Sequence, residues 1–212
     1  VPLKEGKLFM TDTGGHYLEG STDITRTVAF GEVGNTEKEH FTLVARAMLR
    51  LANTVFLYGC SGANLDCIAR EVFWKEGLNF NHGTGHGVGY LLNIHEGPIN
   101  FRWKEGERPA PALEENMVIT DEPGIYIEGS HGIRLENELL VRKTVKNEYG
   151  QFMNFEILTY VPIDLDAILP EKMSTEEKEM LNHYHKQVYE KVSPYLSEEE
   201  RIWLKEYTRA VK

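Results

Sequence analysis

Apolar and polar positions in the first thirty residues follow a pattern typical of short β-strands. The segments 8–13, 17–18 and 22–30 are rich in Thr, Val and Phe, and the glycine-containing stretches 14–15 and 19–21 lie between them. Runs of this kind that are bounded by turn residues predict strands. We therefore expect three short strands here, with turns at both glycine-containing stretches.

The pattern then changes to apolar positions three and four residues apart, which indicates amphipathic helices. Thr36 and Glu39 have the spacing of a capping box and predict the start of the first helix. A second helix is predicted over residues 64–76, and Gly77 suits its C-terminal cap. The apolar faces of the two helices are Phe41, Val44, Met48 and Ala52, and Leu65, Ile68, Val72 and Phe73.

A glycine-rich stretch with several histidines follows, and a second group of strands is predicted over residues 117–121, 125–127 and 133–142. The first and second strand groups are related in sequence. Residues 11–21 align without gaps on residues 120–130, with matching Thr, Asp, Gly, Tyr, Glu, Gly and Ser. We infer a duplicated scaffold whose two halves each consist of a helix pair followed by a hairpin.

The first hairpin begins too close to Val1 for its own helix pair to precede it. We therefore expect the chain to begin inside its domain and to be stable only with an upstream segment of the same protein. An apolar face around Leu8, Met10, Ile24 and Val28 would otherwise be uncovered, which favours aggregation or association.

The C-terminal part has a different pattern. Ser174 with Glu177, and Ser197 with Glu200, predict two capped helices with aromatic, amphipathic faces. We expect residues 1–157 to form one domain and residues 158–212 to form a helical extension packed on it. Helices of this kind often pack against a partner subunit, so a homodimer is expected.

Composition narrows the possible classes. The 212 residues can bury one substantial core, and the formal net charge of -10 argues against nucleic-acid binding. The longest apolar runs fall well short of the roughly 18–20 residues that a membrane span requires. Cys60 and Cys67 lack metal-binding or disulfide spacing, which favours a reduced, cytoplasmic protein.

Five residues in dense local motifs are candidate metal ligands: Asp12, Asp23, His86, Glu122 and Glu136. Four carboxylates and one imidazole can hold two divalent cations, because carboxylates can bridge. Oxygen-rich ligation suits Mn, Mg or Co better than a closed structural zinc site. Two such ions roughly 3.5–4 Å apart would clamp a hydrolytic transition state.

The order and spacing of these residues resemble the pita-bread metallopeptidases, which include methionine aminopeptidase, prolidase and Xaa-Pro aminopeptidase. The motifs at 82–89 and 93–98, the step from Glu122 to Glu136, and the tail from Leu158 to His185 are similar to the long, three-domain Xaa-Pro aminopeptidases. The resemblance implies an α+β pita-bread fold with helices packed on antiparallel sheet. It also implies cleavage of the bond before a proline at the second position of a peptide.

By this resemblance, Asp12 and Asp23 hold one metal ion, while Asp23 and Glu136 bridge to a second that His86 and Glu122 complete. The expected metal is Mn, with Co or Zn as alternatives. Glu122 is the expected proton carrier. His95 is expected to donate to the developing oxyanion, His82 to shape the substrate pocket, and Arg134 to support the carboxylates or the leaving group.

Each candidate has a plainer alternative. Asp12 and Asp23 could be turn residues, although Asp is depleted in strands such as the one predicted around Asp23. Without the surrounding motifs, a histidine such as His82 or His95 is more often a structural residue than a catalytic one. For the whole chain the alternatives are a prolidase that cleaves Xaa-Pro dipeptides, a non-catalytic binding module of the same fold, and an inert fragment.

Overall fold

The computed structural model describes residues 2–104 and 110–212 and has an α+β architecture, as predicted. Its helices are α1 (Asn35–Ala52), α2 (Gly62–Lys75), α3 (Thr175–Val192) and α4 (Glu198–Tyr207). Its strands are β1 (Lys7–Tyr17), β2 (Gly20–Phe30), β3 (Phe56–Leu57), β4 (Gly85–Val88), β5 (His95–Phe101), β6 (Val118–Asp121), β7 (Gly124–Ile127), β8 (His131–Arg134), β9 (Asn137–Asn147) and β10 (Gly150–Ile157). Three 3-10 turns cover Leu165–Ala167, Pro170–Lys172 and Ser193–Tyr195.

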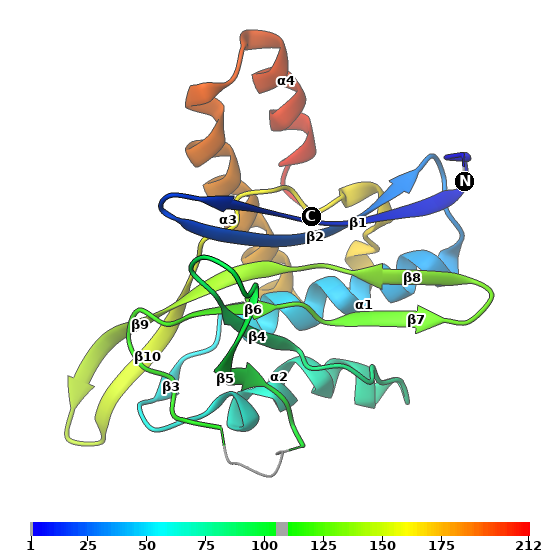
Figure 1. Ribbon diagram of the computed structural model, residues 1–212. Coiled ribbons are helices and arrows are strands. Elements are labelled where there is room, and N and C mark those ends of the chain that lie inside the picture. Colours follow the sequence, from blue (N-terminus) through cyan, green and yellow to red (C-terminus); the bar gives the residue numbers. More distant parts are fainter. Residues whose placement is uncertain (1, 105–109) are drawn as a thin grey trace.

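Antiparallel pairing joins the strands into one sheet and two hairpins. The sheet has the order β3-β10-β9-β6-β4-β5, and the hairpins are β1–β2 and β7–β8. In Figure 1 the β1–β2 hairpin (blue) runs alongside β8 and β9 (green), and α2 and α4 lie at opposite ends of the molecule. Helix α1 lies at the centre and contacts α2, α3, β6, β8 and β10. β3, β5 and β10 were not among the strands predicted from the sequence pattern.

The first hairpin corrects the predicted turn at Gly14–Gly15. β1 continues through both glycines to Tyr17, and only residues 18–19 turn the chain into β2. Gly14 pairs with Asp23, and a side chain at Gly14 would collide with the carbonyl oxygen of Thr22. The glycine is therefore needed for close approach of the two backbones, not for a turn.

The predicted apolar face around Leu8, Met10, Ile24 and Val28 is also wrong in its grouping. Ile24 pairs with Thr13 and Val28 pairs with Phe9. Because directly opposite residues of an antiparallel pair share a face, and side chains alternate along a strand, Ile24 and Val28 lie on the face opposite to Leu8 and Met10.

The second hairpin shows how the two related segments differ. The two hairpins turn at nearly the same aligned position: β1 ends at Tyr17, and β7 ends at Ile127, one residue beyond the Tyr126 that aligns with Tyr17. In the second segment, however, the chain leaves the sheet at Glu122 and Pro123, since proline cannot donate to a ladder. The strand predicted over 133–142 is likewise divided into β8 and β9 at Leu135–Glu136.

The predicted helix starts are partly wrong. α1 begins at Asn35 with Gly34 as its N-cap, so Thr36 lies inside the helix and the expected Thr36–Glu39 capping box does not form. α2 begins at Gly62, two residues before the predicted start. Asn64 lies in its first turn and accepts a hydrogen bond from the backbone N–H of Ser61 at 2.8 Å. The capping boxes predicted for α3 and α4 are confirmed.

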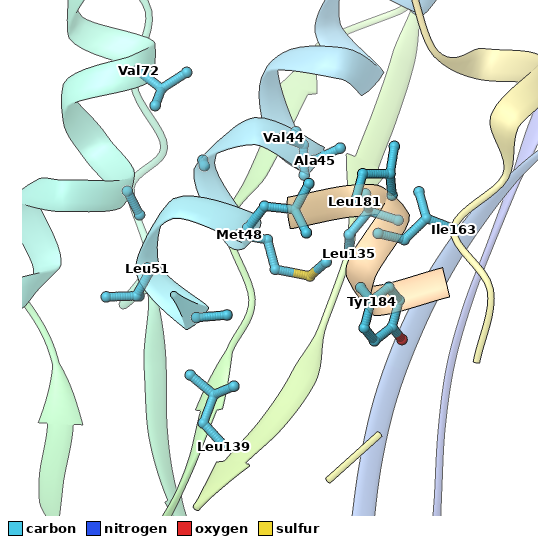
Figure 2. Close-up of a cluster of buried hydrophobic side chains, with 14 of the residues drawn as sticks. Val44, Ala45, Met48, Leu51, Val72, Leu135, Leu139, Ile163, Leu181 and Tyr184 are labelled. Atoms are coloured by element: carbon cyan, nitrogen blue, oxygen red, sulfur yellow. The ribbon is translucent and has the colours of Figure 1, made fainter. Parts of the chain in front are cut away.

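The core centres on α1 and extends into the C-terminal part of the chain. Figure 2 shows Val44, Ala45 and Met48 of α1 gathered with Leu181 and Tyr184 of α3. All five side chains are at most 1% exposed. Burial of each large apolar side chain contributes roughly 1.5–3 kcal/mol, so these contacts anchor α3 to the main core.

His185 gives this part of the core a predicted pH dependence. Its Nε2 accepts a hydrogen bond from the backbone N–H of Ile163 at 3.0 Å, which requires a neutral ring. Burial, followed by the charges of Arg26 and Arg209, lowers the pKa of His185 from 6.5 to about 4. Between these values the unfolded chain binds a proton that the folded chain does not. The contribution of neutral His185 to the free energy of unfolding is therefore complete above pH 6.5. It falls by on the order of 3 kcal/mol as the pH drops towards 4.

Replacement of His185 by Gln keeps a hydrogen-bond acceptor but removes the titration. We expect the free energy of unfolding of His185→Gln to depend less steeply on pH between 6.5 and 4. Denaturant unfolding at several pH values measures this slope for both proteins. Equal slopes would show that His185 does not contribute to acid sensitivity.

Candidate metal centre

The hairpin register brings Asp12 and Asp23 to the same face. Asp12 pairs with Thr25, and Asp23 pairs with Gly14, so both carboxylates project from the side of the hairpin that faces β8 and β9. Asp23 is 8% exposed. The absence of a side chain at Gly14 leaves room beside it. The eleven-residue spacing thus produces a carboxylate pair because the turn lies midway between the two residues.

His86 reaches the same region from β4. Its Nδ1 lies 3.0 Å from the carbonyl oxygen of Gly87, which fixes the hydrogen on Nδ1 and leaves the lone pair on Nε2. That Nε2 lies 3.5 Å from Asp23 Oδ2 and 3.4 Å from Glu122 Oε1. Burial opposes protonation of the ring, but Asp23 and the other acceptors around it raise the pKa of His86.

Both glutamates lie where a strand is interrupted. Glu122 follows β6, and its backbone N–H donates to the carbonyl oxygen of Thr84 at 2.7 Å. Glu136 lies between β8 and β9 and is 1% exposed. Thr25 holds Glu136 in two ways: its hydroxyl donates to Oε2 at 2.7 Å, and its carbonyl oxygen accepts the backbone N–H of Glu136 at 3.0 Å.

These side chains converge into groups that could hold a metal ion. Within each group the ligand atoms lie within 4.8 Å of one another: Asp12, Asp23 and Glu136; His86, Glu122 and Glu136; and Asp23, His86 and His95. Asp23, His86 and Glu136 each belong to two groups, and of these three only the two carboxylates can bridge a pair of ions. The structure therefore brings together all five predicted ligands.

Two observations show that the residues fit divalent cations. The Nε2 of His86 is buried and has no hydrogen-bond partner among the described residues. Burial and the neighbouring Glu122 carboxylate raise the pKa of Glu136 to about 8. Packing several carboxylates together in a protein interior is unfavourable without positive charge, and metal ions would supply that charge.

His95 lies at the open side of this cluster. Its ring stacks on His86, with centroids 3.7 Å apart and an interplanar angle of 24°. His95 also lines a cavity of about 280 Å³, together with Asp12, Asp23 and His16. The histidine is thus close enough to contact a bound substrate, and close enough to compete as a ligand.

The structure places His82 apart from the metal cluster. His82 lines a different cavity of about 210 Å³, together with Asn79, Arg102 and Trp103. Its ring packs edge-on against Tyr126, with centroids 5.4 Å apart. The predicted role in shaping a substrate pocket therefore rests on this second cavity. His82 is linked to the cluster through Tyr126, whose hydroxyl accepts a hydrogen bond from Arg134.

Arg134 connects the cluster to its surroundings. Its Nη2 donates to Asp12 Oδ2 at 2.6 Å, and its Nη1 donates to the hydroxyl of Tyr126 at 3.0 Å. Its Nε donates to the hydroxyl of Thr25 at 3.2 Å and lies 3.9 Å from Glu122 Oε2. Arg134 thus contacts two of the predicted ligands and the residue that holds Glu136.

Several supporting residues were missed by the sequence analysis. Glu138 is 6% exposed, and its Oε1 accepts the backbone N–H of Asp23 at 3.0 Å. Burial raises the pKa of Glu138 to about 7. Period-two alternation from Glu136 could have indicated that Glu138 lies on the same face. Thr25 carried no comparable signal, since Thr is common in strands.

A buried ion pair holds the backbone at His82 and, through Thr84, at Glu122. Arg70 Nε and Asp66 Oδ2 lie 2.5 Å apart, and Arg70 Nη2 donates to the carbonyl oxygen of His82 at 2.7 Å. The hydroxyl of Thr84 donates to Asp66, and the carbonyl oxygen of Thr84 accepts from Glu122. The pair therefore fixes both the backbone of His82 and that of a predicted ligand.

Comparison with known proteins gives concordant matches. Residues 1–143 match metallopeptidase family M24, and residues 151–211 match the C-terminal region of peptidase M24. A probable Xaa-Pro aminopeptidase P of Paracoccidioides brasiliensis is 41% identical over 209 residues, which cover 96% of this chain and 34% of that protein. The chain thus spans about a third of the length of the curated relatives it matches.

Solved structures show the same fold. The X-prolyl aminopeptidase of Caenorhabditis elegans, a cytosolic enzyme with a di-nuclear active site, matches with a TM-score of 0.90 and 36% identity, over 97% of this chain and 34% of that one. The Xaa-Pro dipeptidase of Bacillus anthracis matches with a TM-score of 0.61 and 34% identity, over 77% of this chain and 42% of that one. The pita-bread fold expected from the sequence is confirmed.

Proposed function

The chain belongs to metallopeptidase family M24, and from this premise we propose that the protein is a metal-dependent aminopeptidase. The proposed substrates are peptides with proline at the second position, cleaved at the bond before that proline. One observation carries the proposal above all: four carboxylates and His86 converge from separate segments of the chain, and all five predicted donors are present. A domain that only binds partners has no need to bury such an assembly.

In the proposed reaction, bound divalent cations would acidify the attacking water and stabilise the charge that develops on the carbonyl oxygen. Glu122 would accept the water proton and deliver it to the leaving nitrogen. Burial raises the pKa of Glu122, which makes its carboxylate a better proton acceptor. His95 would donate to the developing oxyanion from the open side of the cluster.

The remaining residues bind and orient. Arg134 would hold the carboxylate of Asp12 in place and keep Tyr126 beside His82. His82 would contact the peptide from the neighbouring cavity. The preference for proline is supported by the names of the relatives alone. The imide nitrogen of proline lacks a hydrogen, which is why such bonds call for a dedicated enzyme.

The metal ions are proposed to be Mn, because four of the five predicted donors are carboxylates. Co or Zn are the alternatives. Thiolate ligation is not involved, since Cys60 and Cys67 lie outside the three donor groups. Metal analysis of the purified protein, followed by titration of the metal-free protein with each ion, identifies the metal.

A cytoplasmic homodimer is part of the same proposal. Among the described residues, none of the helices has the length and apolarity to cross a bilayer. The related enzyme of C. elegans is described as cytosolic. The upstream segment of the same protein is the other proposed partner, and sedimentation of the full-length protein measures its oligomeric state.

Prolidase activity is the second candidate, because the chain also matches the Xaa-Pro dipeptidase of B. anthracis. A panel of Xaa-Pro dipeptides and Xaa-Pro-Xaa tripeptides separates the two activities. We expect the full-length protein to cleave the tripeptides with a higher kcat/KM than the dipeptides. The matched control is the same tripeptide with alanine in place of proline. Preferential cleavage of the dipeptides would favour prolidase, and no cleavage of any peptide would favour a binding module.

A further inference from the structure

Arg26 is a buried cation that lies next to the candidate metal centre without being a predicted ligand. It is 5% exposed and occupies the opposite face of β2 from Asp23. Among residues 2–104 and 110–212, no carboxylate lies within 4.0 Å of its guanidinium, and all of its hydrogen-bond partners are neutral. A buried charge without a counter-ion is tolerated only when its donors are fully used.

One side of the guanidinium holds the backbone of Glu136. Arg26 Nη1 donates to the carbonyl oxygen of Glu136 at 2.5 Å. It also donates to the carbonyl oxygen of Thr25, the residue that precedes Arg26, at 2.8 Å. Nη2 donates to Asn137 Oδ1 at 2.7 Å. Because the chain leaves the sheet at Leu135–Glu136, Glu136 lies outside the strand pairing, and Arg26 and Thr25 supply its backbone hydrogen bonds.

The other side of the guanidinium is held by residues 158–212. Nη2 donates to the carbonyl oxygen of Val161 at 2.9 Å and to the hydroxyl of Tyr184 at 2.8 Å, and Nε donates to the carbonyl oxygen of Pro162 at 3.1 Å. The Tyr184 hydroxyl donates in turn to Val161 at 2.6 Å. Figure 2 shows Tyr184 on α3 within the cluster of buried side chains. Half of the hydrogen bonds of Arg26 therefore depend on the C-terminal extension.

We infer that the C-terminal extension positions the predicted ligand Glu136 through Arg26, and that Arg26 and Tyr184 are positioning residues for the metal centre. The inference rests on the proposed function only in taking Glu136 as a ligand. The carboxylate of Glu136 is oriented by its backbone and by Thr25, and the backbone is held by a guanidinium whose own position the extension fixes. A displaced carbonyl at Glu136 would move a donor shared by two of the three groups.

Two conservative variants of the full-length protein test this. Arg26→Lys keeps the charge, but a single ammonium cannot reach both sides. We expect it to weaken Mn²⁺ binding by roughly 10–100-fold, as loss of a residue that orients a ligand does. Tyr184→Phe keeps the buried ring and removes only the hydroxyl, so a smaller loss in the same direction is expected. Competition with a chelator of known affinity measures Mn²⁺ binding without substrate.

Leu181→Val is the matched control. Leu181 lies on the same helix as Tyr184 and is fully buried, but forms no hydrogen bond with Arg26. We expect this variant to lower the melting temperature while Mn²⁺ affinity stays at the wild-type value. If Arg26→Lys and Tyr184→Phe changed Mn²⁺ affinity no more than Leu181→Val does at an equal loss of melting temperature, the extension would serve only the core.

The result of this Mn²⁺-binding test can be separated from a test of the proposed peptidase activity. Weaker Mn²⁺ binding in both variants supports the inference even if the wild-type protein cleaves no Xaa-Pro peptide. Conversely, normal Mn²⁺ binding in both variants overturns it even if the wild-type protein is an active aminopeptidase. With an active enzyme, kcat should recover in Arg26→Lys as the Mn²⁺ concentration is raised, because the defect lies in metal binding.

Discussion

Glu136→Ala and Asp23→Ala are each expected to abolish binding of at least one metal ion and to lower turnover by orders of magnitude. Both residues are carboxylates that belong to two of the donor groups. Because both are predicted to bridge the two ions, each substitution is expected to weaken both metal positions. The remaining donors would leave each ion with fewer ligands in a buried site. Metal content by mass spectrometry and Xaa-Pro hydrolysis measure the two effects.

Glu138→Gln is the matched control for these variants. Glu138 is also a buried carboxylate beside Asp23, but it lies outside the three donor groups. Gln keeps an oxygen that can accept the backbone N–H of Asp23. We expect Glu138→Gln to retain both metal ions. Normal metal content together with normal turnover in Asp23→Ala or Glu136→Ala would show that the dinuclear assignment is wrong.

His95→Ala is expected to keep metal content near that of the wild type while kcat falls by roughly 10²–10³-fold, the usual cost of losing an oxyanion donor. The ring stacks on His86 and lines the cavity above Asp12 and Asp23, where the carbonyl oxygen of a bound peptide could lie. Steady-state kinetics on an Xaa-Pro tripeptide, with metal analysis of the same preparation, tests this.

The geometry also allows a different result for His95. Its ring nitrogen forms a donor group with Asp23 and His86, so loss of metal in His95→Ala would make His95 a ligand. Unchanged turnover would make it a structural residue. His16→Ala is the control, because His16 lines the same cavity but hydrogen-bonds to Ser21, at 2.7 Å. We expect His16→Ala to retain nearly full turnover.

The five candidate donors that the sequence indicated converge in the structure, whereas most of the residues that hold them carried no signal in the sequence. Asp12 and Asp23 were paired through the family resemblance of their spacing, because the turn predicted at Gly14–Gly15 gave the wrong hairpin register. The caps at Ser174 and Ser197 follow from three-residue spacings. The start of α1 was placed wrongly at Thr36, because a capping-box spacing inside a helix looks the same as one at its end.

Long-range contacts explain the other errors. Gly14 was assigned to a turn, yet its role depends on the carbonyl of Thr22 in the facing strand. The division of the strand at Glu136 depends on Thr25, and the importance of Arg26 depends on Val161 and Tyr184, which lie far away in the sequence. Single-sequence patterns carry no information about such partners, although they do indicate which residue types are unusual in a strand.

The long sequence separation of the donor set has a consequence for how the protein acquires its metal. The hydrogen bond that holds the Glu136 carboxylate joins residues 111 positions apart. Contacts of such high sequence separation form late, because the entropy of closing a long loop must be overcome first. During synthesis the hairpin with both aspartates would emerge long before Glu136 leaves the ribosome. The complete set of ligands therefore exists only in the fully folded chain, and loading with metal should follow folding instead of guiding it.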